Sequence, residues 1–176
     1  MPLPIAHGLL GASIVAALHQ EPTRIRYSMS LVVGALLANA ADLDFLLVAG
    51  LGSKAWHRSF THSIVFSLVI CLLFIVILGN RQFRNAMAYG LAFTSHGCLD
   101  YLTSKNGGGV ELLWPLSKAK FILGWWGLSE VPSQFTRMEI VGALAVETAL
   151  FSLLLIAILL LRRSLAKSMS SAADAI

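Results

Sequence analysis

The sequence predicts an all-α fold, a multi-pass membrane helix bundle with about five hydrophobic helices. Hydrophobic residues make up 57% of the 176 residues and charged residues only 12%, whereas soluble domains carry roughly 25% charged residues. The mean hydropathy is +0.77, and the apolar residues gather in long runs. A chain this short cannot bury so much apolar surface in a water-facing globule. The lipid bilayer must therefore be its solvent.

The apolar runs divide the chain into five segments, and none of them alternates as a half-buried strand would. They cover residues 5–18, 28–51, 62–79, 85–102 and 140–161. Because about 20 helical residues span the hydrocarbon, the first and fourth segments are expected to tilt or to lie partly inside the bundle. We predict one integral-membrane domain over residues 1–163, followed by a disordered polar tail over 164–176.

The N-terminal segment lacks the positively charged start of a signal peptide, so we expect it to be a retained helix. Between the fourth and fifth segments lies one long connection, residues 103–139, which contains Trp114 and the Trp125-Trp126 pair. Tryptophan is enriched at the headgroup level of membranes, so this loop is expected to lie along the interface.

The two cysteines, Cys71 and Cys98, lie inside apolar runs. This placement does not suggest an extracellular disulfide framework, and both are expected to be buried thiols.

The basic residues indicate membrane lipids rather than nucleic acid as partners. The net charge is +4, but lysine and arginine stand singly or in pairs beside apolar runs, not in a stripe. One side of the membrane receives Arg24, Arg26, Arg81, Arg84, Arg162, Arg163 and Lys167. The other receives Lys54, Arg58, Lys105, Lys118, Lys120 and Arg137. The first group lies in short turns, where the positive-inside rule is most reliable, so we predict that side to be cytoplasmic.

Histidine and aspartate are costly inside a membrane and mark functional sites by default. Here they fall at the starts of the first and third segments and the ends of the second and fourth. Since successive helices reverse direction, all these positions belong to one face of the bundle. They are His7, Asp42, Asp44, His57, His62, His96 and Asp100. His19 falls at the opposite end of the first segment and is excluded.

The spacing of these residues suits a metal site but leaves alternatives open. His96 and Asp100 are four apart, on one face of a helix, and could instead form a helix–helix hydrogen-bonded pair. Asp42 and Asp44 would point about 200° apart on a regular helix. Either the helix ends there, or one carboxylate is a ligand and the other supports it. A buried ion pair with Arg58 is the alternative to a metal for compensating their charge.

The densest cluster is residues 57–63, which read His-Arg-Ser-Phe-Thr-His-Ser. Imidazoles and carboxylates together bind zinc, and also manganese or iron. Arg58 could clamp a phosphate or stabilise an anionic transition state, or simply face lipid headgroups. Ser59 or Thr61 is expected to cap the following helix.

Glu147 lies in the fifth segment without an obvious partner. We expect it to pair within the bundle, with a role as proton acceptor as the alternative.

These residues also resemble a known family. The 57–63 heptapeptide is similar to the His-Arg-Gly-Phe-Thr-His-Ser motif of the YdjM-type inner-membrane proteins, which are named for a LexA-regulated member. The His7-Gly8 pair, Asp42-Leu43-Asp44, His96 with Asp100, and the Val-Glu-Leu-Leu-Trp-Pro run at 110–115 follow in the family's order. The resemblance covers about residues 5–116, and the fifth segment adds only hydrophobicity. Ser59 replaces the usual glycine, while Ala41 and Phe45 replace the proline and histidine around the paired aspartates.

The resemblance implies a metal-dependent hydrolase. The family is distantly similar to zinc-dependent phospholipase C and the enzymes related to it. These helical enzymes hydrolyse phosphodiesters with zinc-activated water. By this likeness, His7, Asp42, His57, His62, His96 and Asp100 would bind zinc, or manganese or iron. Asp44 would be a further ligand or the base, and Arg58 would stabilise developing charge. The substrate would be a phosphoester or phospholipid at the inner membrane, with the site facing the periplasm.

Two other classes of protein fit the same residues. In a metal or proton transporter they would line a path, although clustering at one face disfavours a path through the bilayer. In a non-catalytic membrane protein they would hold a structural metal, with a closed coordination sphere that leaves no position for water.

Overall fold

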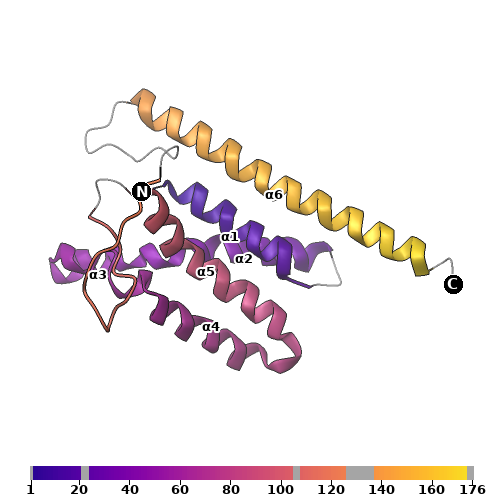
Figure 1. Cartoon of the computed structure of the whole chain (residues 1–176), viewed down its shortest axis with the longest axis horizontal. Helices are drawn as coiled ribbons and strands as arrows, with labels where there is room; N and C mark the ends of the chain where they lie inside the picture. Colours follow the sequence, from indigo (N-terminus) through magenta and orange to yellow (C-terminus); the bar gives the residue numbers. More distant parts are fainter. Residues whose placement is uncertain (1, 21–23, 105–107, 126–136, 174–176) are drawn as a thin grey trace.

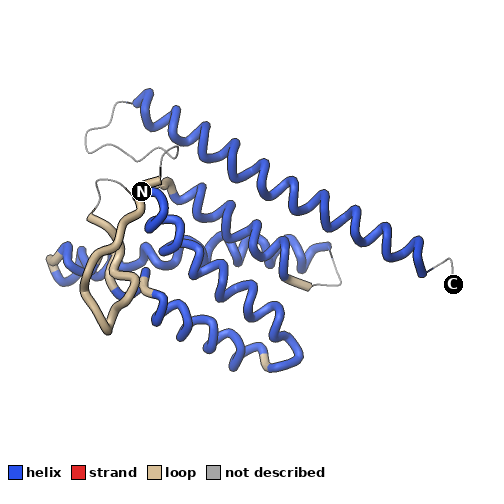
Figure 2. Tube along the Cα trace, in the orientation of Figure 1, coloured by secondary structure: helices blue, strands red, loops and turns tan. Residues whose placement is uncertain are grey.

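The computed structural model describes residues 2–20, 24–104, 108–125 and 137–173, and these are folded as helices joined by turns and loops (Figure 1). No strand forms among the described residues, where Val110 and Phe121 make a single isolated β-bridge, and Figure 2 shows the same all-helical trace. The α-helices are α1 (Pro4–Leu18), α2 (Arg24–Asn39), α3 (Asp44–Leu51), α4 (Ile64–Leu78), α5 (Phe83–Thr103) and α6 (Arg137–Ala173). The predicted all-α fold is confirmed.

Helix α1 lies in the middle of the bundle and packs against α2, α5 and α6, while α4 packs against the far side of α5. Small residues allow close approach at these crossings. A side chain on Gly11 of α1 would collide with the carbonyl of Gly34 in α2, and one on Gly90 of α5 would collide with Cys71 of α4. Close contact through small residues is how helices associate in lipid, where apolar surface alone gives no drive to pack.

By length and composition, fewer candidate membrane spans are found than the five predicted, although all five segments are helical. Within the described residues, two stretches are long and apolar enough to cross a membrane, Ile25–Leu51 and Met138–Ser168. A third is reached if the segment 54–62 and α4, which meet at a 52° bend, count as one span. Helix α1 has only 15 residues, and α5 carries polar residues that lower its hydropathy. Both are covered by other helices.

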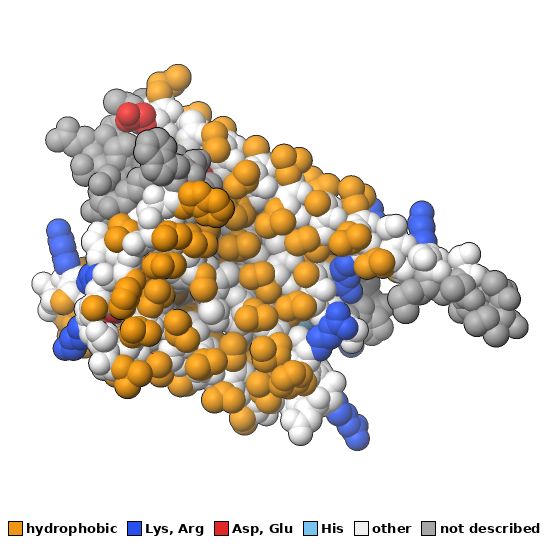
Figure 3. Space-filling model, in the orientation of Figure 1, with side chains coloured by type: hydrophobic (Ala, Val, Ile, Leu, Met, Phe, Trp, Pro, Cys, Tyr) orange, Lys and Arg blue, Asp and Glu red, His pale blue; other side chains and the backbone are white. Residues whose placement is uncertain are grey.

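The outer surface fits a bilayer. In Figure 3, hydrophobic side chains cover the visible face of the helices, and Lys and Arg side chains gather toward its two ends. Exposed apolar side chains in water would mark an aggregation-prone patch. Here they form the belt that hydrocarbon requires.

Three local expectations fail. The second segment is not one helix, because a 3-10 turn, Ala40–Leu43, separates α2 from α3. The tail predicted to be disordered continues α6 to Ala173, since its alanine, leucine and lysine residues favour helix; residues 174–176 lie outside the described part. Cys98 is exposed rather than buried, whereas Cys71 is buried as expected.

Of the loop predicted at the interface, residues 103–104, 108–125 and 137–139 are described, so Trp126 lies outside the description. Its described part returns to the end of the bundle that holds the start of α1 and the end of α5. There Leu123 N donates to Tyr101 O and Trp125 N donates to Leu102 O. The interfacial depth of the loop stays a prediction.

Helix α6 contributes more than hydrophobicity, because it caps both ends of α1. The backbone N–H of Leu3 donates to Glu147 Oε2 over 2.8 Å, and Arg162 Nη1 donates to the carbonyls of Ala16 and His19. A helix leaves its first N–H and last C=O groups unpaired, and its dipole favours an anion at the start and a cation at the end. Glu147, fully buried, therefore pairs within the bundle as expected.

We predict that Arg162→Leu lowers the free energy of unfolding by about 1.5–3 kcal/mol, because hydrogen bonds from a charged group to two carbonyls are lost. The measurement is unfolding by sodium dodecyl sulfate in mixed micelles, followed by circular dichroism. Arg163→Leu is the matched control, because Arg163 is the exposed neighbour and its loss should change the value by less than about 0.5 kcal/mol. Equal effects of the two changes would contradict the capping role.

The orientation prediction can be tested with single cysteines in a Cys71→Ala, Cys98→Ser background. Lys118 lies at the site end, Arg81 lies in the turn between α4 and α5, and both are exposed. A membrane-impermeant maleimide added to spheroplasts should label Lys118→Cys and spare Arg81→Cys until the membrane is opened. Labelling in the opposite order would place the site in the cytoplasm.

Candidate metal centre

Four parts of the chain that are distant in sequence meet at one end of the bundle. The first turns of α1 bring His7, and the break between α2 and α3 brings Asp42 and Asp44. Two 3-10 turns, Lys54–Trp56 and Phe60–His62, carry the ligand loop, residues 57–63. The last turns of α5 bring His96 and Asp100. The structure thus brings together the seven histidines and aspartates that the sequence singled out, and Arg58 with them.

The helix break at 40–43 resolves the spacing of the two aspartates. On a continuous helix Asp42 and Asp44 would point apart, but the tighter 3-10 turn directs both toward the ligand loop. Asp42 faces His62 and His96, and Asp44 faces His57 and Arg58. The regular helix ends at Asn39, as the first of the two alternatives supposed.

The site is buried at one side and open at the other. His7, His96 and Asp100 are fully buried, and His62 is 2% exposed. The Asp42 side chain is 17% exposed and that of His57 22%. Solvent or a substrate group can therefore reach the cluster from the Asp42–His57 side.

The histidine and aspartate atoms form ion-pair contacts longer than usual hydrogen bonds, at separations that also suit ligands of one metal ion. His96 Nε2 lies 3.3 Å from Asp42 Oδ1, His7 Nε2 lies 3.5 Å from Asp100 Oδ1, and His62 Nε2 lies 3.6 Å from Asp42 Oδ1. Hydrogen bonds between such atoms are about 2.7–3.2 Å long. Two ligands of one tetrahedral ion, each about 2.1 Å from it, stand about 3.4 Å apart.

Seven buried atoms of these side chains have no hydrogen-bond partner among the described residues. They are both ring nitrogens of His7, Nε2 of His62 and His96, both oxygens of Asp100, and Oδ1 of Asp42. Leaving a buried polar atom unpaired costs about 1–3 kcal/mol, so one cluster of so many requires an explanation. A divalent cation would satisfy them, and the residues fit one.

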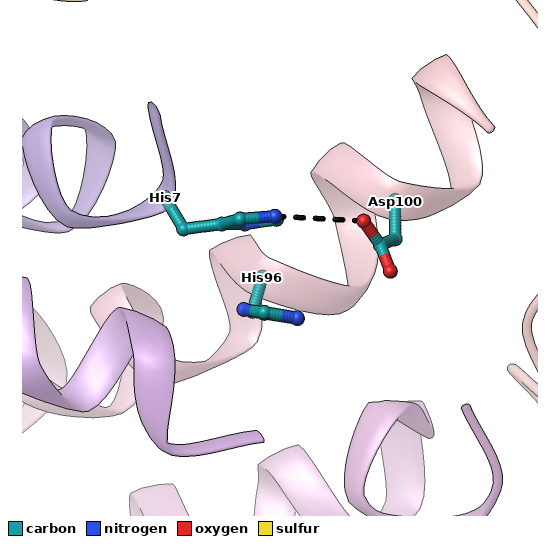
Figure 4. Close-up of side chains that lie close together, drawn as sticks. All are labelled: His7, His96 and Asp100. Carbon is teal, nitrogen blue, oxygen red and sulfur yellow. Dashed lines mark ion pairs between the residues drawn. The ribbon is translucent and has the colours of Figure 1, made fainter. Parts of the chain in front are cut away.

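Hydrogen bonds orient the imidazoles for this role. His96 Nδ1 donates to the carbonyl of Ala38 over 2.6 Å, which leaves Nε2 with its lone pair directed toward Asp42. Thr61 Oγ1 lies 2.9 Å from His62 Nδ1 and donates to Asp44 Oδ2, so His62 also presents Nε2 to the site. Fixing the far nitrogen in this way is typical of metal-binding histidines. His7 stacks on His96 with ring centroids 3.8 Å apart, and Figure 4 shows both rings beside Asp100.

Asp44 organises the ligand loop. Its Oδ2 accepts the backbone N–H of Arg58 over 2.9 Å, and its Oδ1 lies 3.1 Å from His57 Nδ1. Asp44 is 1% exposed. These contacts engage both of its oxygens, so Asp44 has less free capacity for a metal than Asp42.

Arg58 does not face the lipid headgroups. It is 4% exposed, adopts a left-handed backbone with φ of 58°, and places Nε 3.4 Å from Asp100 Oδ2. The side chain pairs with Asp100, a partner that the predicted ion pair with Asp42 or Asp44 did not include. A charged guanidinium thus lies beside the candidate ligands.

Sequence reasoning missed Glu111 and assigned the helix cap to the wrong residues. Glu111, which is 7% exposed, accepts a hydrogen bond from Ser59 Oγ over 2.7 Å, and its N–H donates to the carbonyl of Arg58. Helix α4 is capped by Ser63, whose Oγ accepts the N–H of Phe66, rather than by Ser59 or Thr61. A lone carboxylate in the apolar run at 110–116 was the available signal for Glu111.

The fold and this cluster define a class: an all-helical membrane protein with a buried histidine–aspartate centre. A family model described as YdjM inner membrane protein matches residues 1–169. The chain is also 32% identical over 142 residues to "Inner membrane protein YbcI" of Escherichia coli (strain K12), which covers 78% of this chain and 81% of the relative. No solved structure matches.

The chain belongs to the YdjM inner membrane protein family, and it is an inner-membrane protein. The expected resemblance is confirmed, and the family match extends beyond residue 116 to include most of α6.

We predict that Gly97→Ala disturbs the site, because its new Cβ would lie 2.6 Å from the carbonyl oxygen of His62. Overpacking of this kind costs about 1–3 kcal/mol, measured by dodecyl sulfate unfolding. Gly50→Ala in α3 is the control, since nothing lies within 4 Å of the added methyl group. If Gly97→Ala is no more destabilising than Gly50→Ala, the close contact of α5 with the ligand loop is refuted.

Proposed function

We propose that this protein is a membrane-bound, metal-dependent hydrolase that acts on a phosphoester or phospholipid. The observation that carries the proposal is the set of buried, unpaired imidazole and carboxylate atoms that lie 3.3–3.6 Å apart with one open side. Zinc is the favoured ion, and manganese or iron would also suit these donors. The ligands are His7, Asp42, His57, His62, His96 and Asp100.

The residues around the ligands supply the remaining requirements of hydrolysis. A bound divalent ion would lower the pKa of water and polarise a phosphoryl oxygen. The Arg58 guanidinium, 3.4 Å from Asp100, would stabilise negative charge that develops on the phosphoryl group. Asp44, whose Oδ1 lies 3.1 Å from His57 Nδ1, would be a further ligand or would accept the proton released by water.

The depth of the site in the membrane also supports a phospholipid substrate. We propose that α1 and α5 are embedded along with the longer helices, so that the chain passes the membrane five times. Helix α5 has 21 residues and would extend about 31 Å, enough to cross. The site then lies at one membrane surface, on the periplasmic side in the predicted orientation, at the depth of lipid headgroups.

The proposal predicts metal-dependent turnover by purified protein. In mixed micelles it should contain zinc, manganese or iron and hydrolyse a labelled phospholipid or bis(4-nitrophenyl) phosphate. His62→Ala should lose most of the metal and the activity. Arg58→Gln should retain metal but lose about 10²- to 10³-fold in turnover, as when one transition-state donor is removed. His19→Ala is the control histidine, because it lies at the opposite end of α1.

The rival functions are separate outcomes of the same experiment. Folded, metal-loaded protein that hydrolyses neither compound would refute the hydrolase and favour a transporter or a structural metal site. Negligible metal in wild-type protein would refute both the hydrolase and the metal centre.

A further inference from the structure

We propose that the centre holds two cations at unlike positions, a closed nitrogen-rich one and an open oxygen-rich one. The inference rests on the metal centre of the proposed function and adds to it the number and character of the ions. It follows from how the candidate ligands divide, from their burial, and from the hydrogen bonds that they already make.

The ligands are too many for one ion and divide into sets. Zinc usually takes four protein or water ligands, yet seven histidine and aspartate side chains converge here. Their donor atoms form three groups, each with all atoms within 4.8 Å of one another. The groups are His7, His96 and Asp100; Asp42, His62 and His96; and Asp42, Asp44 and His57.

The first and third groups share no residue, so both can be filled at once. The second group shares His96 with the first group and Asp42 with the third. It is therefore an alternative to them rather than a third site. His62, which belongs to the second group alone, lies between the first and third groups. His62 Nε2 is 3.6 Å from Asp42 Oδ1 and 3.8 Å from Asp100 Oδ2, so it can complete either position.

The closed position is formed by His7, His96 and Asp100. All three side chains are fully buried, and two of the three donors are imidazole nitrogens. Arg58 Nε lies 3.4 Å from Asp100 Oδ2 and His7 Nε2 lies 3.5 Å from Asp100 Oδ1, while the carbonyl of Ala38 accepts a hydrogen bond from the far nitrogen of His96. A dry site with fixed nitrogen donors suits zinc and should exchange its ion slowly.

The open position is formed by Asp42, Asp44 and His57, and an ion there would replace the present contact between Asp44 Oδ1 and His57 Nδ1, which is 3.1 Å long. It carries two carboxylates, and the side chains of Asp42 and His57 are 17% and 22% exposed. Oxygen donors favour harder cations such as manganese or magnesium, and the exposure leaves room for water or a phosphoryl oxygen. This position should therefore exchange readily, and it is the one in contact with substrate.

The test is metal stoichiometry in the full-length protein loaded with zinc, dialysed, and then titrated with manganese. Wild-type protein and the His19→Ala control should retain about one zinc and bind about one manganese, detected by elemental analysis and manganese electron paramagnetic resonance. His57→Ala should keep its zinc and lose the manganese signal. His7→Gln should lose the retained zinc. Circular dichroism and gel filtration must show that each variant is folded, and Asp42→Asn and Asp100→Asn replace any variant that is not.

Three results would overturn the inference: one ion in total per wild-type chain, loss of both ions together in folded His57→Ala, or no retained metal. The fate of the proposed function is read separately. Two ions without hydrolysis would leave the two positions standing and refute the hydrolase. One ion with hydrolysis would refute the two positions and leave the hydrolase standing.

Discussion

The rest of the structure depends on one electrostatic constraint, the gathering of ionisable side chains inside an apolar bundle. Isolated charges are too costly in such surroundings, so each must find a partner or a cation. The break between α2 and α3, the two 3-10 turns and the left-handed backbone of Arg58 all serve to bring donors from separate helices to one point. Regular helix alone would direct Asp42 and Asp44 to different sides.

Packing makes this arrangement rigid. Gly97 lets α5 approach the carbonyl of His62, and the loop after α5 closes over the ligand loop through Glu111 and through Leu112 O, which accepts the N–H of Ile64. The ligands therefore lie on backbone that is held from two directions. A centre held in this way can keep like charges close before any cation arrives, which is what electrostatic preorganisation requires.

Part of the fold and the site could be predicted because the relevant signals are local. Composition alone places the chain in a membrane, and reversal of direction between successive helices places His7, Asp42, His62 and His96 at one face. Contacts that depend on distant partners could not be predicted. The Glu147–Leu3 bond joins residues 144 positions apart, and the choice of Asp100 as the partner of Arg58 depends on the conformation of a turn. Fewer candidate spans are found than expected because α1 has only 15 residues and polar residues, most of them buried, lower the hydropathy of α5.

The capping of α1 by α6 has a consequence for biosynthesis. Helix α1 is translated before the other described helices and carries His7, but Glu147 and Arg162, which satisfy its two ends, belong to the last of these helices. Until they arrive, the ends of α1 must be satisfied by water, headgroups or the insertion machinery. The centre can thus reach its final form only when the whole chain has entered the membrane, so that a prematurely terminated chain would carry most of the ligands without the means to hold the first of them in place.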